Sequence, residues 1–353
     1  MAGPRYPFHE FFAGSGLAGC GLSPTFCSVW ANDISERKAQ VYRANFDPSV
    51  LHVGDISQVH GSELAPASLS WASFPCQDLS LAGNIDGIYS NRSGLVWQWL
   101  RILDEGGDVA PRVVCLENVA GLVSAHGGDD YRHLHAALTK RGYAVGAVLI
   151  NARRFVPQSR PRVFVIGTRG DIPLGLRAEH PSWAHPQTLA KLGSSLGDFV
   201  WWDIPEPSSP KSSLTDIVEM GVPFDRDDVI ELIPERHKEK LAASGLDYAT
   251  GYRRTRGGRQ VLELRCDGVA GCLRTPAGGS SRQFLIHRDE YGLHARLLTT
   301  REVARLMGAP ENFILPGSYN DGYFAMGDAV VVPVVRYLSE AILSKLVEAA
   351  YAV

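Results

Sequence analysis

Short apolar runs alternate with helical stretches along the first 170 residues of the chain. Residues 35–45 and 131–141 have the spacing of amphipathic helices. The strand-like runs lie at residues 7–12, 27–31, 51–53, 69–73, 113–116 and 163–166. This alternation predicts an α/β fold with a doubly wound, mostly parallel sheet. Ligands of such sheets bind at the carboxyl ends of the strands.

The amino-acid composition of the sequence changes after Asp171. Pro, Ser and Gly dominate as far as residue 213, helical patterns follow, and an arginine- and glycine-rich β-like stretch comes next. A helix is predicted at residues 300–307, with Thr300 as its cap and Glu302 in its first turn, and another at residues 333–351. We therefore expect three parts: a catalytic and cofactor-binding domain over 1–171, a smaller inserted domain over 172–300, and a return to the first domain over 301–353.

Polar motifs follow the first three predicted strands. A glycine turn over residues 13–16 comes directly after the first strand, where the backbone can approach a ligand at a helix N-terminus. Asp33 closes the second strand and is placed to hold ribose hydroxyls. Asp55 follows the third and can accept a hydrogen bond from an adenine amino group. Each feature alone is more typical of a turn, but together they indicate a nucleoside pocket.

Cys76 lies in the segment Phe-Pro-Cys-Gln at residues 74–77, at the end of the next strand. A free cysteine is most often a small buried residue. A cysteine at the ligand edge of a sheet can instead ionise and act as a nucleophile. Glu117 follows the neighbouring strand, so a carboxyl group is expected at the same edge.

These two groups match the chemistry of methylating carbon 5 of cytosine. Addition of a thiolate to C6 makes C5 nucleophilic, and that addition requires a proton or hydrogen bond at N3, which a buried carboxyl with a raised pKa can supply. A base inside a duplex cannot be reached, so the nucleotide must flip out.

With these motifs in place, the chain resembles bacterial DNA (cytosine-5) methyltransferases, of the restriction-modification type, over nearly its whole length. Residues 10–17 resemble the first cofactor motif, with Glu10 where aspartate is usual. Residues 74–77 resemble the nucleophile motif, 117–119 the acid motif and 158–162 the Gln-x-Arg-x-Arg motif. Residues 296–302 resemble the block that organises the recognition domain. Residues 327–330 resemble the last motif, with Asp328 where asparagine is usual.

The resemblance implies a role for each matched residue. Cys76 is the nucleophile, Glu117 the partner of N3, and Arg162 holds the base oxygen while Arg160 positions the phosphate backbone. Residues 78–95 resemble a mobile loop that closes over the flipped base. The residues implied in binding S-adenosylmethionine are Phe12, Gly14, Gly16, Leu17, Asp33, Ile34, Asp55, Ile56, Pro75, Leu95, Asp328 and Ala329.

The insertion, by the same resemblance, is the target-recognition domain and binds double-stranded DNA. Residues 253–301 carry ten arginines, no lysine and four acids, whereas the whole chain has a net charge of −3. One basic segment on an acidic body suits a polyanion docking on one face, or equally a solvated loop whose arginines make surface pairs. Most single arginines there would only neutralise phosphate. The predicted DNA-contacting residues are Gln77, Ser80, Arg253, Arg254, Arg256, Arg274, Ser280, Arg282 and Gln283.

The remaining features of the sequence argue against a membrane-spanning, secreted or zinc-binding protein. No apolar run approaches the roughly 20 residues that span a bilayer, and no secretory segment precedes residue 7, so a cytoplasmic, nucleoid-associated protein is expected. The six cysteines form no CxxC pair and are expected as free thiols. Zinc bound by Cys266, Cys272, His287 and His294 fits no common spacing, so no metal is expected.

Three rival functions remain open at this stage. An RNA cytosine methyltransferase would share the mechanism, a silent binding protein would keep the pocket, and an NAD oxidoreductase would share only the glycine turn and Asp33. We expect a monomer, with any cognate restriction endonuclease acting as a separate protein.

Overall fold

The computed structural model describes residues 5–75, 94–208, 212–275 and 282–352. Seven strands form the main sheet in the order β3-β2-β1-β4-β5-β7-β6, parallel except that β7 runs antiparallel to both of its neighbours. The strands are β1 (Tyr6–Phe11), β2 (Phe26–Asp33), β3 (Leu51–Val53), β4 (Leu69–Ala72), β5 (Val113–Val119), β6 (Ala144–Asn151) and β7 (Pro161–Thr168). The predicted α/β fold with a doubly wound, mostly parallel sheet is confirmed.

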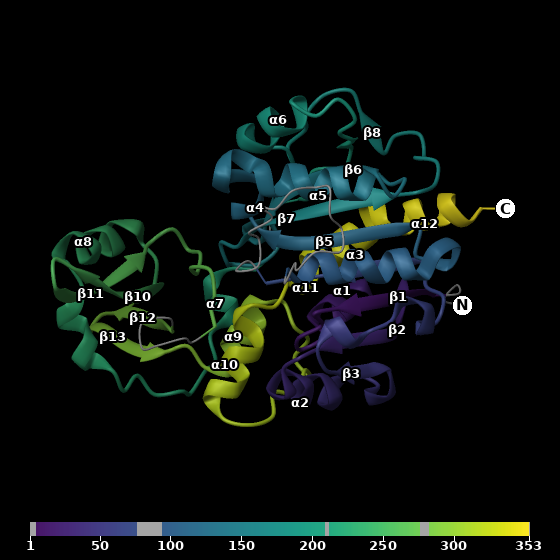
Figure 1. Ribbon diagram of the computed structural model, residues 1–353. Coiled ribbons are helices and arrows are strands. Elements are labelled where there is room, and N and C mark those ends of the chain that lie inside the picture. The colour runs from purple at the N-terminus through teal and green to yellow at the C-terminus, as the bar shows by residue number, and fades with distance from the viewer. Residues whose placement is uncertain (1–4, 76–93, 209–211, 276–281, 353) are drawn as a thin grey trace.

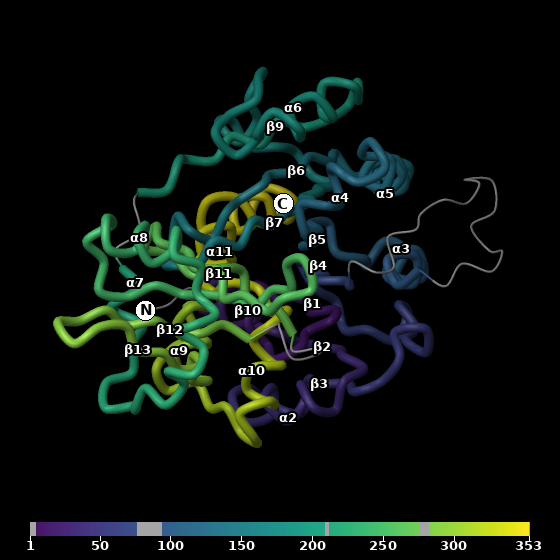
Figure 2. The backbone as a smooth tube through the Cα atoms, turned by 90° about the vertical axis from the view of Figure 1, so that its left-hand side faces the viewer, coloured from purple at the N-terminus to yellow at the C-terminus, as the bar shows by residue number. Residues whose placement is uncertain are grey.

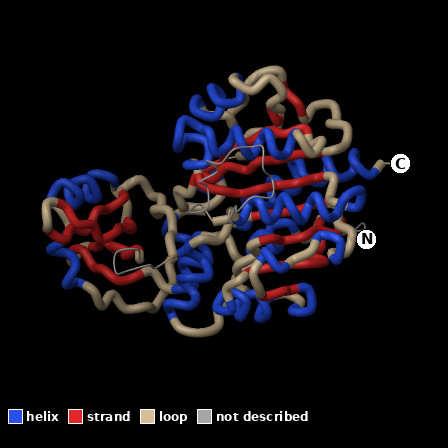
Figure 3. The backbone as a smooth tube through the Cα atoms, in the orientation of Figure 1, coloured by secondary structure: helices blue, strands red, loops and turns tan. Residues whose placement is uncertain are grey.

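Alternating residues of the strands feed two hydrophobic cores, one on each face of the sheet. In β5, Val113 and Cys115 belong to one core, and Val114 and Leu116 to the other. This is the side-chain alternation of a strand buried on both faces. Figure 3 shows the helices lying on either side of these strands.

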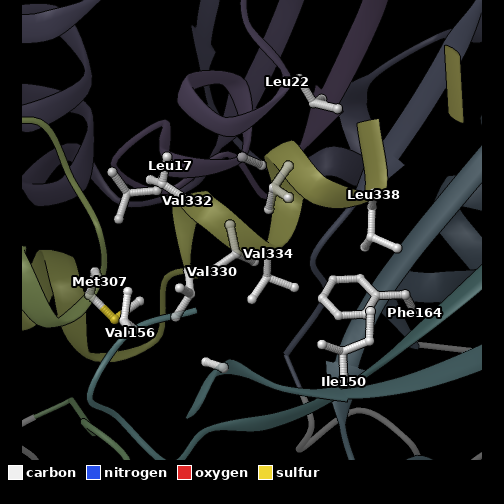
Figure 4. Packing of buried hydrophobic residues seen from close by; sticks show 14 of the residues in the cluster. Leu17, Leu22, Ile150, Val156, Phe164, Met307, Val330, Val332, Val334 and Leu338 are labelled. Carbon is white, nitrogen blue, oxygen red and sulfur yellow. The ribbon is translucent and has the colours of Figure 1, made fainter. Parts of the chain in front are cut away.

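The helices of the main domain divide between the two faces. The face with Cys115 packs against α1 (Leu17–Leu22), α11 (Val332–Leu338) and α12 (Ser344–Tyr351); Figure 4 shows side chains from α1 and α11 in this core. The opposite face packs against α3 (Leu95–Gly106), α4 (Gly121–Ser124), α5 (Asp129–Thr139) and α6 (Gln187–Ser194). The predicted C-terminal helix is thus α11 and α12, joined by a π-helical turn over Ser339–Leu343.

The strand order reverses between β1 and β4, and ligands bind at such a switch point. From β1 the chain proceeds outward to β2 and β3, and α2 (Glu36–Asn45) follows β2. From β4 it proceeds the other way to β5. The carboxyl ends of β1 and β4 therefore open one crevice, and the motifs at Phe12, Pro75 and Glu117 all lie along that edge.

A second, smaller lobe carries an antiparallel sheet in the order β11-β10-β12-β13 (Figure 1). Its strands are β10 (Tyr248–Arg256), β11 (Arg259–Arg265), β12 (Gln283–Asp289) and β13 (Gly292–Leu297). α8 (Glu235–Ser244) covers it, and Leu241 of that helix packs with Leu262 and Ile286 in a separate core. Figure 2 views the molecule from the side of this lobe.

Three helices lie between the two sheets in Figure 1: α7 (Leu214–Ile217), α9 (Thr300–Leu306) and α10 (Tyr319–Gly327). Arg296 at the end of β13 is 2% exposed and makes two hydrogen bonds, of 2.6 and 2.7 Å, to the carboxylate of Glu302 on α9. Glu302 lies in the first turn as predicted, but the cap is Thr299, one residue before the predicted Thr300. This buried ion pair ties the small sheet to the main domain.

The first part of the predicted insertion packs on the main sheet. β9 (Trp201–Trp202) pairs with β8 (Arg177–Ala178), and the Val200 amide donates a 2.8 Å hydrogen bond to the Val145 carbonyl of β6. Gly146 permits this approach, because a Cβ there would lie 1.9 Å from the Val200 carbonyl oxygen. Residues 177–202 are therefore structurally part of the larger lobe.

Candidate active site

Glu117, near the carboxyl end of β5, forms an ion pair with Arg162 of the adjacent strand β7. The Nε atom of Arg162 lies 2.9 Å from Oε1 of Glu117, and the glutamate is 5% exposed. Burial raises the pKa of Glu117, an effect opposed by the charges of Arg162 and Arg160 and by a hydrogen bond from Ser73. A carboxyl with a raised pKa can hold a proton and donate it to a ring nitrogen.

Asn118, the next residue, anchors the segment that leads to Cys76. Its Nδ2 donates a 2.9 Å hydrogen bond to the carbonyl of Phe74, and its Oδ1 accepts one from the amide of Val119. The end of β4 is thus bound to the end of β5, and Pro75 lines the same cavity as Glu117.

Asp33 joins the glycine turn to the start of α2. One carboxylate oxygen accepts a hydrogen bond from the amide of Gly14 and the other from the amide of Ser35, both at 2.8 Å. Gly14 has a φ of +57°, which favours glycine. Asn32 fixes the neighbouring strand end, because its Nδ2 donates to the carbonyls of His52 and Gly54 just before Asp55.

These strand ends open into one cavity of about 1060 Å³. The small lobe contributes to its wall through Arg254 and Arg274. Phe12, at the end of β1, lines it with a φ of +58°, a conformation that costs non-glycine residues about 1–3 kcal/mol and is concentrated at functional sites. The predicted cofactor residues that line the cavity are Phe12, Gly14, Leu17, Asp33, Ile34, Asp55, Ile56, Pro75, Leu95, Asp328 and Ala329.

Comparison with known proteins agrees with this arrangement. The C-5 cytosine-specific DNA methylase family model matches residues 6–344. The chain belongs to this family. It is 27% identical over 345 residues to the Type II methyltransferase M.Bsp6I of Bacillus sp. (strain RFL6), covering 96% of this chain and 98% of that protein. The predicted family and the prediction of a cytosine-5 DNA methyltransferase are confirmed.

Solved structures of similar fold include two Dnmt2 proteins. The Schizosaccharomyces pombe (S. pombe) Dnmt2 methyltransferase superposes with a TM-score of 0.61 at 19% identity, covering 95% of this chain and 97% of that one. A Spodoptera frugiperda DNMT2 mutant gives a TM-score of 0.64 at 18% identity, covering 95% and 98%. At such identities the likeness concerns the fold.

Arg160 is not placed as predicted for a residue of this methylase family. It was expected to position the phosphate backbone, but it is 1% exposed. Its guanidinium donates to the carbonyls of Leu273, Gly327 and Ala329 at 2.8, 3.2 and 2.7 Å. Arg160 therefore holds Leu273 against Gly327 and Ala329, and its guanidinium is turned away from solvent.

Two further residues that were predicted to contact a ligand are buried. Gln283, predicted to contact DNA, is fully buried and exchanges hydrogen bonds with the backbone of Gly271. Gly16, predicted to bind cofactor, is not among the residues lining the cavity, and a Cβ there would lie 2.4 Å from the Phe46 ring. Gly16 is thus required for packing between the turn and α2.

The predicted DNA-contacting arginines differ in their surroundings. Arg254 and Arg274 line the cavity. Arg256 pairs with Glu263 at 2.7 Å, Arg253 lies over the Phe284 ring, and Arg282 donates to Asn320. Cys76, Gln77, Ser80 and Ser280 lie outside the described residues, as does most of the predicted loop over 78–95.

The four residues weighed as zinc ligands are used elsewhere. The thiol of Cys272 contacts Arg160, and that of Cys266 lies 3.8 Å from the His237 carbonyl. His287 stacks on Tyr248, and Nδ1 of His294 lies 3.5 Å from Oδ2 of Asp227. In the described part of the chain no three His, Cys, Asp or Glu side chains are grouped as metal ligands, and no helix there is long and apolar enough to cross a membrane.

Several cavity residues were missed from the sequence, most notably Lys38 and Phe324. Lys38 follows the N-cap Ser35 of α2, whose hydroxyl accepts the Lys38 amide. The signal that could have revealed it is its position in the first turn of the helix that follows the ribose-binding candidate Asp33.

Proposed function

We propose that the protein transfers a methyl group from S-adenosylmethionine to C5 of a cytosine flipped out of duplex DNA, through a covalent bond between Cys76 and C6. The observation that carries this proposal is the buried Glu117–Arg162 pair, which shares one cavity with Asp33, Asp55 and Pro75. Family membership adds DNA cytosine as the substrate class.

The cavity residues suit the cofactor. Asp33 offers a fixed carboxylate to ribose hydroxyls, Asp55 an exposed one to an adenine amino group, and the apolar Phe12, Ile34 and Ile56 can enclose the adenine ring. A volume of about 1060 Å³ is enough for a nucleoside cofactor and one base. When bound, S-adenosylmethionine supplies an electrophilic methyl group on a sulfonium.

Three residues of the chain would carry out the remaining steps of the reaction. Arg162 would hold the base oxygen, which orients the ring. Glu117 would donate a proton to N3 as the Cys76 thiolate attacks C6, so that the C5 carbon becomes nucleophilic. After methyl transfer a base removes the C5 proton, the C6–S bond breaks and the thiolate leaves.

The small lobe supports the DNA proposal. We propose that residues from about 214 to 297 form the target-recognition domain, because residues 177–202 pack on the main sheet instead. Arg254 and Arg274 come from this lobe to the cavity, where phosphates beside a flipped nucleotide would lie. Monomeric action and a separately acting restriction endonuclease stay predictions.

The deciding experiment offers labelled S-adenosylmethionine to duplex DNA, to RNA, and to DNA containing 5-fluorocytosine. Fluorine at C5 blocks the final proton removal, so the enzyme should be trapped covalently on DNA. We expect label on DNA and a trapped complex with the native chain, and neither with Cys76→Ala, whose cofactor binding should stay near normal. Label on RNA alone would overturn the substrate, and turnover by Cys76→Ala would overturn the nucleophile.

A further inference from the structure

Lys38 and Asp328 form an ion pair across the wall of the cavity. The Nζ atom of Lys38, in the first turn of α2, lies 2.6 Å from Oδ2 of Asp328, which follows α10. The lysine side chain is 15% exposed and the aspartate side chain 46%, so the carboxylate is open to a ligand. Both residues line the same cavity as the candidate cofactor-binding residues.

The position of Lys38 calls for an explanation. The N-terminus of a helix carries a partial positive charge, so a cation in the first turn is electrostatically unfavourable. The stem of Lys38 nevertheless lies over the glycine turn, since a Cβ on Gly14 would be 3.7 Å from its Cδ, and its ammonium lies 5.6 Å from the Phe324 ring centroid. The side chain is thereby directed along the cavity wall.

The neighbouring cation is engaged elsewhere. Arg37 pairs with Asp321 and lies over the Phe324 ring at 4.5 Å. Lys38 is consequently the cation on α2 that is among the cavity-lining residues.

We infer, on the basis of the proposed function, that Lys38 and Asp328 together bind the amino-acid end of S-adenosylmethionine. This end carries one carboxylate and one ammonium on the same carbon. A site with one fixed ammonium beside one fixed carboxylate is complementary to it: Lys38 binds the α-carboxylate and Asp328 the α-ammonium. The family position of asparagine can therefore be held by Asp328 here, because Lys38 balances the added charge.

The test compares ligands that differ only at this end. Calorimetry measures the binding of S-adenosylmethionine, of its decarboxylated analogue, and of 5′-methylthioadenosine, which lacks the amino-acid end. The native chain should bind S-adenosylmethionine about tenfold or more tightly than the decarboxylated analogue, as expected for a charge-assisted hydrogen bond. Lys38→Met should bind these two alike, and should bind 5′-methylthioadenosine as the native chain does.

Two further variants complete the design. Asp328→Asn should weaken binding of S-adenosylmethionine but leave binding of 5′-methylthioadenosine unchanged, because that ligand has no α-amino group. Arg37→Met removes a neighbouring positive charge from the same helix and should keep the full preference for the carboxylate.

Three outcomes are informative. If Lys38→Met retained the preference for the carboxylate, Lys38 would not be its ligand. If it weakened 5′-methylthioadenosine and S-adenosylmethionine equally, the ion pair would be only a structural tie between α2 and α10. If the native chain bound none of the three nucleosides, the proposed function itself would fail.

Discussion

Glu10 shows how a single residue can make the fold sensitive to pH. It lies in β1, is 1% exposed, and accepts one hydrogen bond, from the amide of Gly19, while its other oxygen has no partner. Burial raises the pKa of Glu10 from 4.5 to about 8. In the folded chain the carboxyl therefore keeps its proton at pH values where the unfolded chain has lost it.

The folded state then binds the extra proton between these two pKa values, so stability must fall as pH rises through that window. We expect the native chain to lose on the order of 3 kcal/mol from about pH 5 to about pH 8 through this group. Glu10→Gln should remove that part of the slope in urea unfolding, whereas the exposed Glu63→Gln should keep it. Parallel slopes for Glu10→Gln and the native chain would show that Glu10 is not protonated in the folded state.

For single residues, the sequence predicts position at a strand end better than it predicts the burial of a side chain. The strand-end positions of Asp33, Asp55 and Glu117 follow from the alternation of strands and helices, and all three reach the cavity. Arg160 and Gln283 have the side chains of DNA-contacting residues, but both are buried by segments distant in sequence. Burial of this kind depends on tertiary packing, which local sequence does not encode.

Among the elements, β9 and the segment before it have a position in the fold that is least evident from the sequence. Their Pro- and Ser-rich surroundings resemble those of a linker, yet Phe199 and Trp202 are buried against the main domain. The contact depends on Gly146 in β6, a position that looks unremarkable in sequence. The close approach of the Val200 backbone and of the Trp202 indole explains why a side chain is absent there.

Gly146→Ala should therefore push residues 200–202 away from β6. A Cβ would lie 1.9 Å from a carbonyl oxygen, and backbone cannot move aside as cheaply as a flexible side chain. We expect a loss of about 1–3 kcal/mol in the free energy of unfolding, the usual range for overpacking. The control is Gly197→Ala on the same segment, where nothing lies within 4 Å of the new Cβ. Equal stability of the two variants would contradict the close packing of β6 and β9.

On the scale of the whole molecule, the charge of the basic segment is much reduced by pairing. Of the ten arginines in residues 253–301, Arg256 pairs with Glu263, Arg265 with Asp267, and Arg296 with Glu302. Arg254 and Arg274 are instead directed to the cavity between the lobes. The net charge of the segment indicates that it binds a polyanion, but the ion pairs determine which arginines are free to contact that polyanion.

DNA binding should therefore depend on Arg254 and Arg274 more than on Arg256. Each phosphate contact releases condensed counterions, so losing one should lower both affinity and the slope of log K against log salt, the slope by about 1. We expect Arg254→Ala and Arg274→Ala to show this in fluorescence anisotropy with a labelled duplex between about 50 and 200 mM salt. Arg256→Ala, on the same strand as Arg254, should match the native slope because Glu263 already neutralises that charge. The same slope of log K against log salt for all three variants would contradict this. It would show that the arginines of the basic segment attract DNA only through their summed charge, without phosphate contacts specific to Arg254 and Arg274.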